Sequence, residues 1–135
     1  MRRFLVDSSV LLDVATEDPR WFSWSAEQIA VCASAGQLVI NPIIYAEVSV
    51  GFERIEQVDD ALSRDVFLRE ALPYAAGFLA GKAFLGYRRR GGSRTTPLPD
   101  FFIGAHAAIA GYRLITRDAA RVRAYFPKVA LICPT

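Results

Sequence analysis

The chain has 135 residues, of which 53% are hydrophobic and 22% are charged, and two are cysteines. This composition is typical of one globular domain with its own core, and it excludes a collagen-like, a disordered or a disulfide-stapled protein. Polar residues, Gly and Pro interrupt the longest uncharged stretch, residues 28–46, so we expect no membrane span. Asp7 ends the first apolar run early, so we expect no secretory leader and a cytoplasmic protein.

The two halves of the sequence carry opposite charge. Residues 1–70 hold 6 basic and 12 acidic side chains, a net charge of −6, whereas residues 71–135 hold 10 basic and 2 acidic ones, a net charge of +8. Apart from Lys82 and Lys128, every basic residue is Arg, which binds phosphate groups at two points and stacks on bases. The basic half therefore suits a polyanion such as nucleic acid, although a solvated basic face fits the charge equally well.

Short apolar runs alternate with segments of helical periodicity along the chain. Asn41 and Pro42 occupy positions that favour a helix start, and Gly91 and Gly92 mark a helix end. In chain order, the predicted elements are a strand over 3–6, a helix around 10–14, a helix over 21–35, a strand over 38–40, helices over 43–55, 59–71, 74–87 and 101–112, a strand over 113–116, a helix over 118–125 and a strand over 129–132. This alternation predicts an α/β fold, a three-layer α/β/α sandwich around a short, mostly parallel sheet, in one domain spanning residues 1–135.

Two acids stand just after predicted strands. Asp7 directly follows the strand over 3–6, and Asp118 comes two residues after the strand over 113–116. Because ligands bind beyond the carboxyl ends of parallel strands, we expect both carboxylates at one edge of the sheet. Each acid also suits the cap of the helix that follows it.

Two further acids lie in apolar helices. Glu47 is surrounded by apolar neighbours, and Asp100 opens an apolar helix, where an acid also suits the helix dipole. Carboxylates that converge to within about 4 Å repel by roughly 4 kcal/mol per pair at an effective dielectric near 20, so a cluster needs a cation or shared protons. Oxygen ligands without His or Cys favour Mg²⁺ or Mn²⁺. Beside an Arg-rich surface, such a site indicates phosphodiester chemistry with one or two metal ions.

Four segments of the sequence resemble the four motifs of PIN-domain ribonucleases, in particular the VapC-type toxins of toxin–antitoxin pairs. In chain order these segments are 4–13 (FLVDSSVLLD), 41–48 (NPIIYAEV), 98–107 (LPDFFIGAHA) and 114–118 (LITRD). The resemblance implies that four acids form a catalytic cluster that binds Mg²⁺, namely Asp7, Glu47, Asp100 and Asp118. It gives Asp7 and Asp100 as the leading metal ligands, with Asp118 as a third, and a supporting hydrogen bond to Thr116. Ser9 departs from the Asn of many relatives, and a supporting role is still expected for it.

The resemblance also implies partners. It implies cleavage of RNA, such as transfer RNA, a homodimer, and inhibition by a small antitoxin protein whose tail covers the site. The candidate RNA contacts are five basic residues, Arg88, Arg89, Arg90, Arg94 and Arg117. The basic segment from Arg88 to Arg94 suits an acidic antitoxin equally well. The sequence does not show whether this segment contacts RNA or the antitoxin.

Other conspicuous side chains are expected to be structural. His106 lies six residues after Asp100, about 240° around the helix, so we expect a packed or surface histidine that points away from the acid. Asp13 is expected to be a solvated or capping acid. Trp21, Phe22 and Trp24 are expected in the core or an interface rather than under RNA bases.

Two other functions stay open from the sequence. The first is a PIN-like module that binds RNA or protein without cutting, although a pure binder gains nothing from repulsion among four acids. The second is a phosphatase with Asp7 as nucleophile, chemistry that resembles the haloacid-dehalogenase phosphatases. The second acid of that motif would fall at position 9, where this chain has Ser9.

Overall fold

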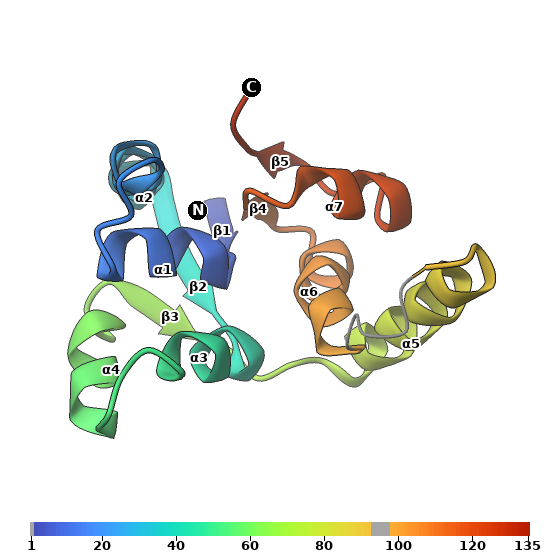
Figure 1. The fold of residues 1–135 in the computed structure, drawn as a ribbon, viewed down its shortest axis with the longest axis horizontal. Helices are drawn as coiled ribbons and strands as arrows, with labels where there is room; N and C mark the ends of the chain where they lie inside the picture. Colours follow the sequence, from blue (N-terminus) through green and yellow to red (C-terminus); the bar gives the residue numbers. More distant parts are fainter. Residues whose placement is uncertain (1, 93–97) are drawn as a thin grey trace.

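A parallel sheet of short strands lies between two groups of helices (Figure 1). The computed structural model describes residues 2–92 and 98–135. The strands in these ranges are β1 (Arg2–Val6), β2 (Gly36–Ile40), β3 (Phe67–Arg69), β4 (Arg113–Ile115) and β5 (Leu131–Ile132). Their order in the sheet is β3-β2-β1-β4-β5, and each neighbouring pair is parallel. The predicted parallel α/β sheet is confirmed.

Helices cover both faces of this sheet. They are α1 (Ser8–Ala15), α2 (Phe22–Ala35), α3 (Pro42–Ser49), α4 (Ile55–Ala61), α5 (Tyr74–Arg89), the 3₁₀ turn η1 (Leu98–Phe101), α6 (Phe102–Ala110) and α7 (Ala119–Tyr125). Helices α1 to α4 lie on one side of the sheet and α5 to α7 on the other (Figure 1). This is the three-layer arrangement that the alternating pattern predicts.

The central strands are apolar because both of their faces are covered. The last three residues of β1 and of β2 are at most 2% exposed. Gly36 begins β2 opposite Arg2, where a Cβ atom would collide with the Arg2 carbonyl oxygen. The pairing of β1 with β2 therefore requires glycine at this position. Asn41 caps α3 as predicted, because its side chain accepts a hydrogen bond from the backbone N–H of Ile44 at 2.9 Å.

Two of the predicted helices are wrong in extent. The helix predicted over 43–55 ends at Ser49, whose hydroxyl donates to the Tyr45 carbonyl at 2.7 Å, a contact that bends a helix at its end. The helix predicted over 59–71 is replaced by α4 and β3. Because β3 has three residues at the edge of the sheet, it carries too short a pattern to be distinguished from a helix.

The strand order creates a crevice between β1 and β4. These neighbours are followed by α1 and α7, which lie on opposite sides of the sheet (Figure 1). At such a switch point the chain diverges beyond the carboxyl ends of the strands and leaves room for a ligand. In the part of the chain that the structure describes, no helix is long and apolar enough to span a membrane.

Candidate active site

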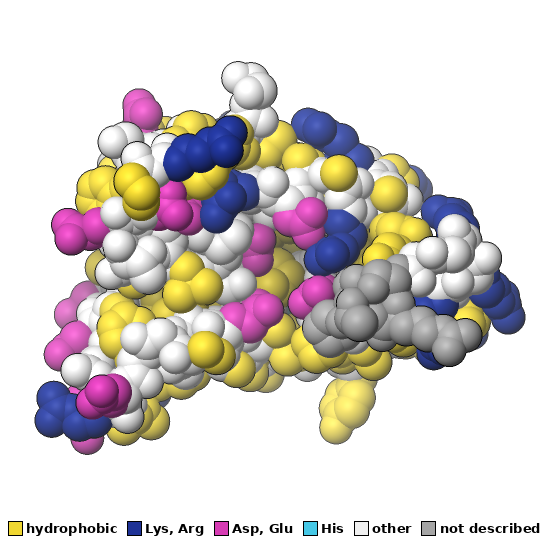
Figure 2. Space-filling model, in the orientation of Figure 1, with side chains coloured by type: hydrophobic (Ala, Val, Ile, Leu, Met, Phe, Trp, Pro, Cys, Tyr) yellow, Lys and Arg dark blue, Asp and Glu magenta, His cyan; other side chains and the backbone are white. Residues whose placement is uncertain are grey.

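A pocket of about 270 Å³ lies at this switch point. All four predicted acids line it, and each comes from a different segment: Asp7 follows β1, Glu47 lies on α3, Asp100 lies on η1 and Asp118 precedes α7. Figure 2 shows acidic side chains gathered around a hollow in the middle of this face. The fold thus brings together carboxylates that span 111 positions of the sequence from Asp7 to Asp118.

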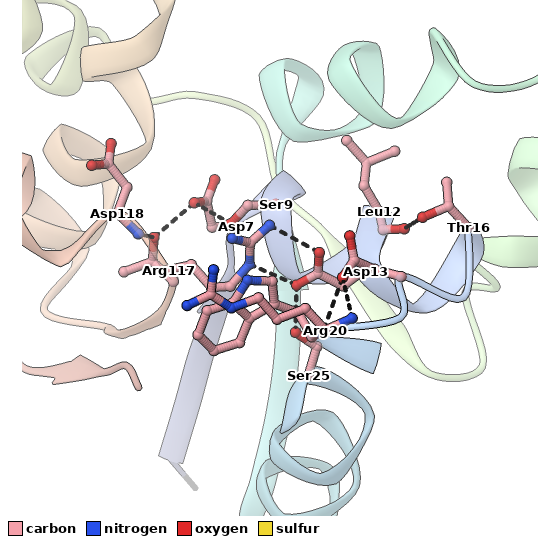
Figure 3. Close-up of polar contacts among 12 residues, drawn as sticks. Asp7, Ser9, Leu12, Asp13, Thr16, Arg20, Ser25, Arg117 and Asp118 are labelled. Carbon is pink, nitrogen blue, oxygen red and sulfur yellow. Dashed lines mark hydrogen bonds and ion pairs between the residues drawn. The ribbon is translucent and has the colours of Figure 1, made fainter. Parts of the chain in front are cut away.

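The Asp7 carboxylate is held by hydroxyl groups. It makes no side-chain cap to α1, although Asp7 stands at the cap position. Instead its Oδ2 accepts a hydrogen bond from Ser9 Oγ at 2.9 Å (Figure 3). The same oxygen accepts a second hydrogen bond from Thr116 Oγ1 at 2.7 Å. Thr116 is 1% exposed and its oxygen also accepts from the Asp118 backbone N–H at 2.9 Å. Asp7, Ser9 and Thr116 therefore form one rigid hydrogen-bonded unit at the end of β1 and β4.

Glu47 enters the pocket from α3. Its Oε1 accepts a hydrogen bond from Ser8 Oγ at 2.8 Å, and the same hydroxyl lies 3.4 Å from Asp7 Oδ1. Burial raises the pKa of Glu47, and the nearby charges of Asp7 and Asp100 raise it further, whereas the Ser8 hydrogen bond lowers it. Ser8 is a site residue that sequence reasoning missed. The run of two hydroxyl residues directly after Asp7 was the available signal.

Asp100 and Asp118 both contact the same positively charged side chain, that of Arg121. Arg121 Nη1 lies 3.0 Å from Asp118 Oδ2 and 3.6 Å from Asp100 Oδ2. Burial raises the pKa of Asp118, Arg121 lowers it, and Asp7 and Asp100 raise it. Asp118 makes no side-chain cap to α7, so its carboxylate remains in the pocket. Arg121 is a second site residue that the sequence analysis missed, and its spacing of three from Asp118 on a helix was the signal.

The donor set of the pocket fits a hard divalent cation, because each of the four acids offers carboxylate oxygens. Across residues 2–92 and 98–135, no three His, Cys, Asp or Glu side chains stand close enough together to hold an ion. The guanidinium of Arg121 lies against two of the four carboxylates. The donor atoms of the site therefore suit the metal, but the carboxylates of the described chain are not spaced to hold one, and two of them contact Arg121 instead.

The predicted RNA contacts fall into three groups. Arg88, Arg89 and Arg90 are exposed at the end of α5, and the Arg90 guanidinium stacks 5.3 Å from the ring of Tyr125 on α7. Arg94 lies outside the described residues. Arg117 instead stacks 5.1 Å from the Trp21 ring and forms an ion pair. Among these candidates the end of α5 is thus the basic segment with exposed side chains, although Arg88 also lies over the Phe84 ring at 5.8 Å.

Asp13 is buried, and the expectation of a solvated or capping acid is wrong. Its side chain is 4% exposed and accepts two hydrogen bonds from Arg117 (Figure 3). Ser25 Oγ donates a third at 2.7 Å. Three charge-assisted bonds compensate the burial of the carboxylate. Asp13 therefore fixes the segment after β4 rather than binding a ligand.

His106 is a packed histidine, one of the two outcomes expected for it. It is 1% exposed, and its Nδ1 lies 3.0 Å from the Asn41 side-chain nitrogen. Because Asn41 uses its oxygen to cap α3, its NH₂ group donates to His106 Nδ1, which places the imidazole proton on Nε2. His106 does not line the acidic pocket and joins α6 to α3.

Comparison with known proteins identifies the family. The PIN domain family model matches residues 4–127, so the chain belongs to the PIN-domain family. No curated protein sequence matches it.

Solved structures share the fold along almost the whole chain. The VapBC2 structure from Rickettsia felis, bound to a promoter DNA fragment, superposes with a TM-score of 0.74 at 15% identity and covers 98% of this chain and 99% of that chain. VapBC-1 from nontypeable Haemophilus influenzae gives 0.71 at 18% identity, with 97% of each chain covered. A toxin–antitoxin complex from Klebsiella pneumoniae gives 0.61 at 24% identity and covers 93% and 94%. At sequence identities of 15% to 24%, this structural similarity shows a shared fold.

Proposed function

We propose that this chain is a Mg²⁺-dependent endoribonuclease that acts as the VapC-type toxin of a toxin–antitoxin pair. The observation that carries the proposal is the meeting of four carboxylates from four segments in one pocket at the switch point of the sheet. Membership of the PIN-domain family and the likeness to VapBC structures support it. The net charge of +8 over residues 71–135 supplies a surface for a polyanionic substrate.

The side chains have distinct roles in this proposal. Asp7, Asp100 and Asp118 would move together around Mg²⁺, with Mn²⁺ as a substitute, because no three of the described acids already stand close enough to hold an ion. Ser9 and Thr116 keep the Asp7 carboxylate turned into the pocket. A bound divalent cation supplies positive charge beside the scissile phosphate and lowers the pKa of water.

Glu47 faces the other three acids from α3. Because burial raises its pKa, its carboxylate is a suitable acceptor for the proton of the attacking water.

In this proposal the RNA strand reaches the acids from the basic end of α5, which packed aromatic rings connect to the segment that carries Asp100. Arg90 stacks on Tyr125, the Tyr125 ring lies 5.6 Å from that of Phe101, and Phe101 directly follows Asp100. The exposed side chains of Arg88 and Arg89 also lie at the end of α5. In this proposal the basic segment at the end of α5 binds phosphates on one side of the scissile bond. The acidic pocket lies beyond that segment and acts on the scissile phosphate.

Protein partners belong to the same proposal. The outer side of α5 exposes large apolar side chains, with Tyr74 fully exposed and Phe78 68% exposed. Exposed apolar side chains that gather on one helix are typical of protein contacts. A cognate antitoxin and a second copy of the chain are the partners we propose, the first because the solved relatives are toxin–antitoxin complexes.

Incubation of purified protein with a total-RNA pool, with Mg²⁺ and with a chelator, tests the proposal. We expect discrete cuts that need the metal, and sequencing of the cleaved fragments identifies the substrate RNA. The alternative function, a module that binds RNA without cutting, draws support from the engagement of two carboxylates by Arg121. Intact RNA under every condition, together with measurable RNA binding, would favour that alternative.

A further inference from the structure

Arg121 lines the acidic pocket together with the four acids, and its side chain is 28% exposed. Its Nη1 atom lies 3.0 Å from Asp118, which directly precedes its helix, and 3.6 Å from Asp100 on η1. One nitrogen thus contacts two carboxylates from segments that the fold brings together.

The guanidinium is fixed in this place by more than its charge. Its Cζ lies 5.6 Å from the ring centre of Phe101, and Phe101 is fully buried. A guanidinium over an aromatic face gains a further electrostatic attraction. The neighbouring Arg123 on the same helix differs, because its Nη2 faces Cys133 Sγ at 3.4 Å and it does not line the pocket.

Arg121 provides the positive charge that the pocket needs without a metal. Among the described residues that line the pocket, it is the one cation facing four acids. An ion that binds both Asp100 and Asp118 has to take carboxylate oxygens that Arg121 already contacts.

We propose that Arg121 is an internal counter-ion that competes with the divalent cation for Asp100 and Asp118. The inference rests on the proposed metal site. A cation that enters the pocket breaks both contacts and frees the guanidinium beside the bound ion. Because a guanidinium pairs well with phosphate oxygens, the freed side chain becomes a phosphate contact for the substrate. Arg121 thereby stabilises the metal-free site and weakens the metal-bound one.

Calorimetric titration of the purified chain with Mn²⁺ tests this competition. The variant Arg121→Gln is compared with wild type and with Arg123→Gln, which removes the same charge from the same helix. Loss of a partly exposed ion pair predicts a Kd for Mn²⁺ that is about three- to tenfold lower in Arg121→Gln. The control is expected to stay within about twofold of wild type, because its charge lies outside the pocket.

The outcomes separate this inference from the proposed function. Equal Mn²⁺ affinity in all three proteins, or an equal gain in both variants, overturns the competition and leaves the metal site standing. Binding by Arg121→Gln alone supports the competition. Absence of Mn²⁺ binding in every protein overturns both.

A measurement on the wild-type chain covers the case in which Arg121→Gln does not fold. The Nε–Hε resonance of Arg121 is followed by ¹⁵N NMR during titration with Mg²⁺, and Arg121→Lys assigns the signal. We expect this resonance to move as the metal saturates, while that of Arg123 stays in place. A stationary Arg121 signal at saturating Mg²⁺ overturns the proposal.

Discussion

Arg117 and Asp13 form a two-point ion pair across 104 positions of the sequence (Figure 3). Arg117 Nε lies 2.7 Å from Asp13 Oδ2, and Nη2 lies 2.9 Å from Oδ1. Because Arg117 stands between Thr116 and Asp118, the pair ties the segment that carries two site residues to α1. The geometry of the acids thus depends on a contact outside the pocket.

We expect Asp13→Asn to destabilise the fold. The change leaves the partly buried Arg117 guanidinium without its counter-charge, which costs about 2 to 3 kcal/mol when the exposed part of Arg117 is allowed for. Chemical denaturation measures the loss. The matched control is Asp60→Asn on the exposed side of α4, for which we expect a change within about 0.5 kcal/mol. Equal stability of the two variants would show that the ion pair contributes nothing.

Added Mg²⁺ is expected to raise the melting temperature. A ligand that binds the native state alone, at ten times its Kd, stabilises the fold by about 1.4 kcal/mol, which corresponds to roughly 4 to 7 °C for a domain of this size. Asp100→Asn should reduce this shift, and Asp60→Asn should retain it. A full-sized shift in Asp100→Asn would remove Asp100 from the ligand set.

Stability is expected to fall in mild acid because of His106. Burial lowers its pKa below the ordinary value of 6.5, although the nearby Glu70 carboxylate opposes the shift. The unfolded chain therefore takes up the proton first, and the free energy of unfolding decreases as the pH falls below about 6.5. Protonation also places a hydrogen on Nδ1, which faces the NH₂ group of Asn41.

Denaturation of wild type and of His106→Gln between pH 7.5 and pH 5 measures this effect. The variant should be less stable at pH 7.5, because its smaller side chain packs less well, and should show a flatter decline toward pH 5. An identical decline in both proteins would assign the acid sensitivity to other groups.

Charge reversal at the end of α5 is expected to weaken RNA binding. Replacement of Arg88, Arg89 and Arg90 by Glu removes cations that bind phosphates. The dependence of log affinity on log salt should therefore become flatter, by about 0.7 for each phosphate of a single strand that is no longer neutralised. Arg64→Glu, in the acidic half of the chain, serves as the control. An unchanged salt slope in the triple variant would mean that the segment serves another partner, such as the antitoxin.

The sequence predicts those features of the fold and the site that depend on local residue patterns. The central strands follow from continuous apolar runs, and the shared edge for Asp7 and Asp118 follows from their positions after strands. The partner of Asp13 is 104 positions away and leaves no local trace, so its burial was not predictable. The short edge strand β3 was not predictable either, because tertiary pairing with β2, rather than its own pattern, decides its conformation.

Cleavage of an end-labelled RNA by wild type, Asp7→Asn and Asp60→Asn, purified in parallel, tests whether Asp7 acts in metal-dependent RNA cleavage. We expect discrete cuts by wild type and Asp60→Asn in Mg²⁺, none in chelator, and a loss of at least about 100-fold in Asp7→Asn with its fold retained. Cleavage by Asp7→Asn at the wild-type rate, or cleavage that persists without metal, would contradict this role of Asp7.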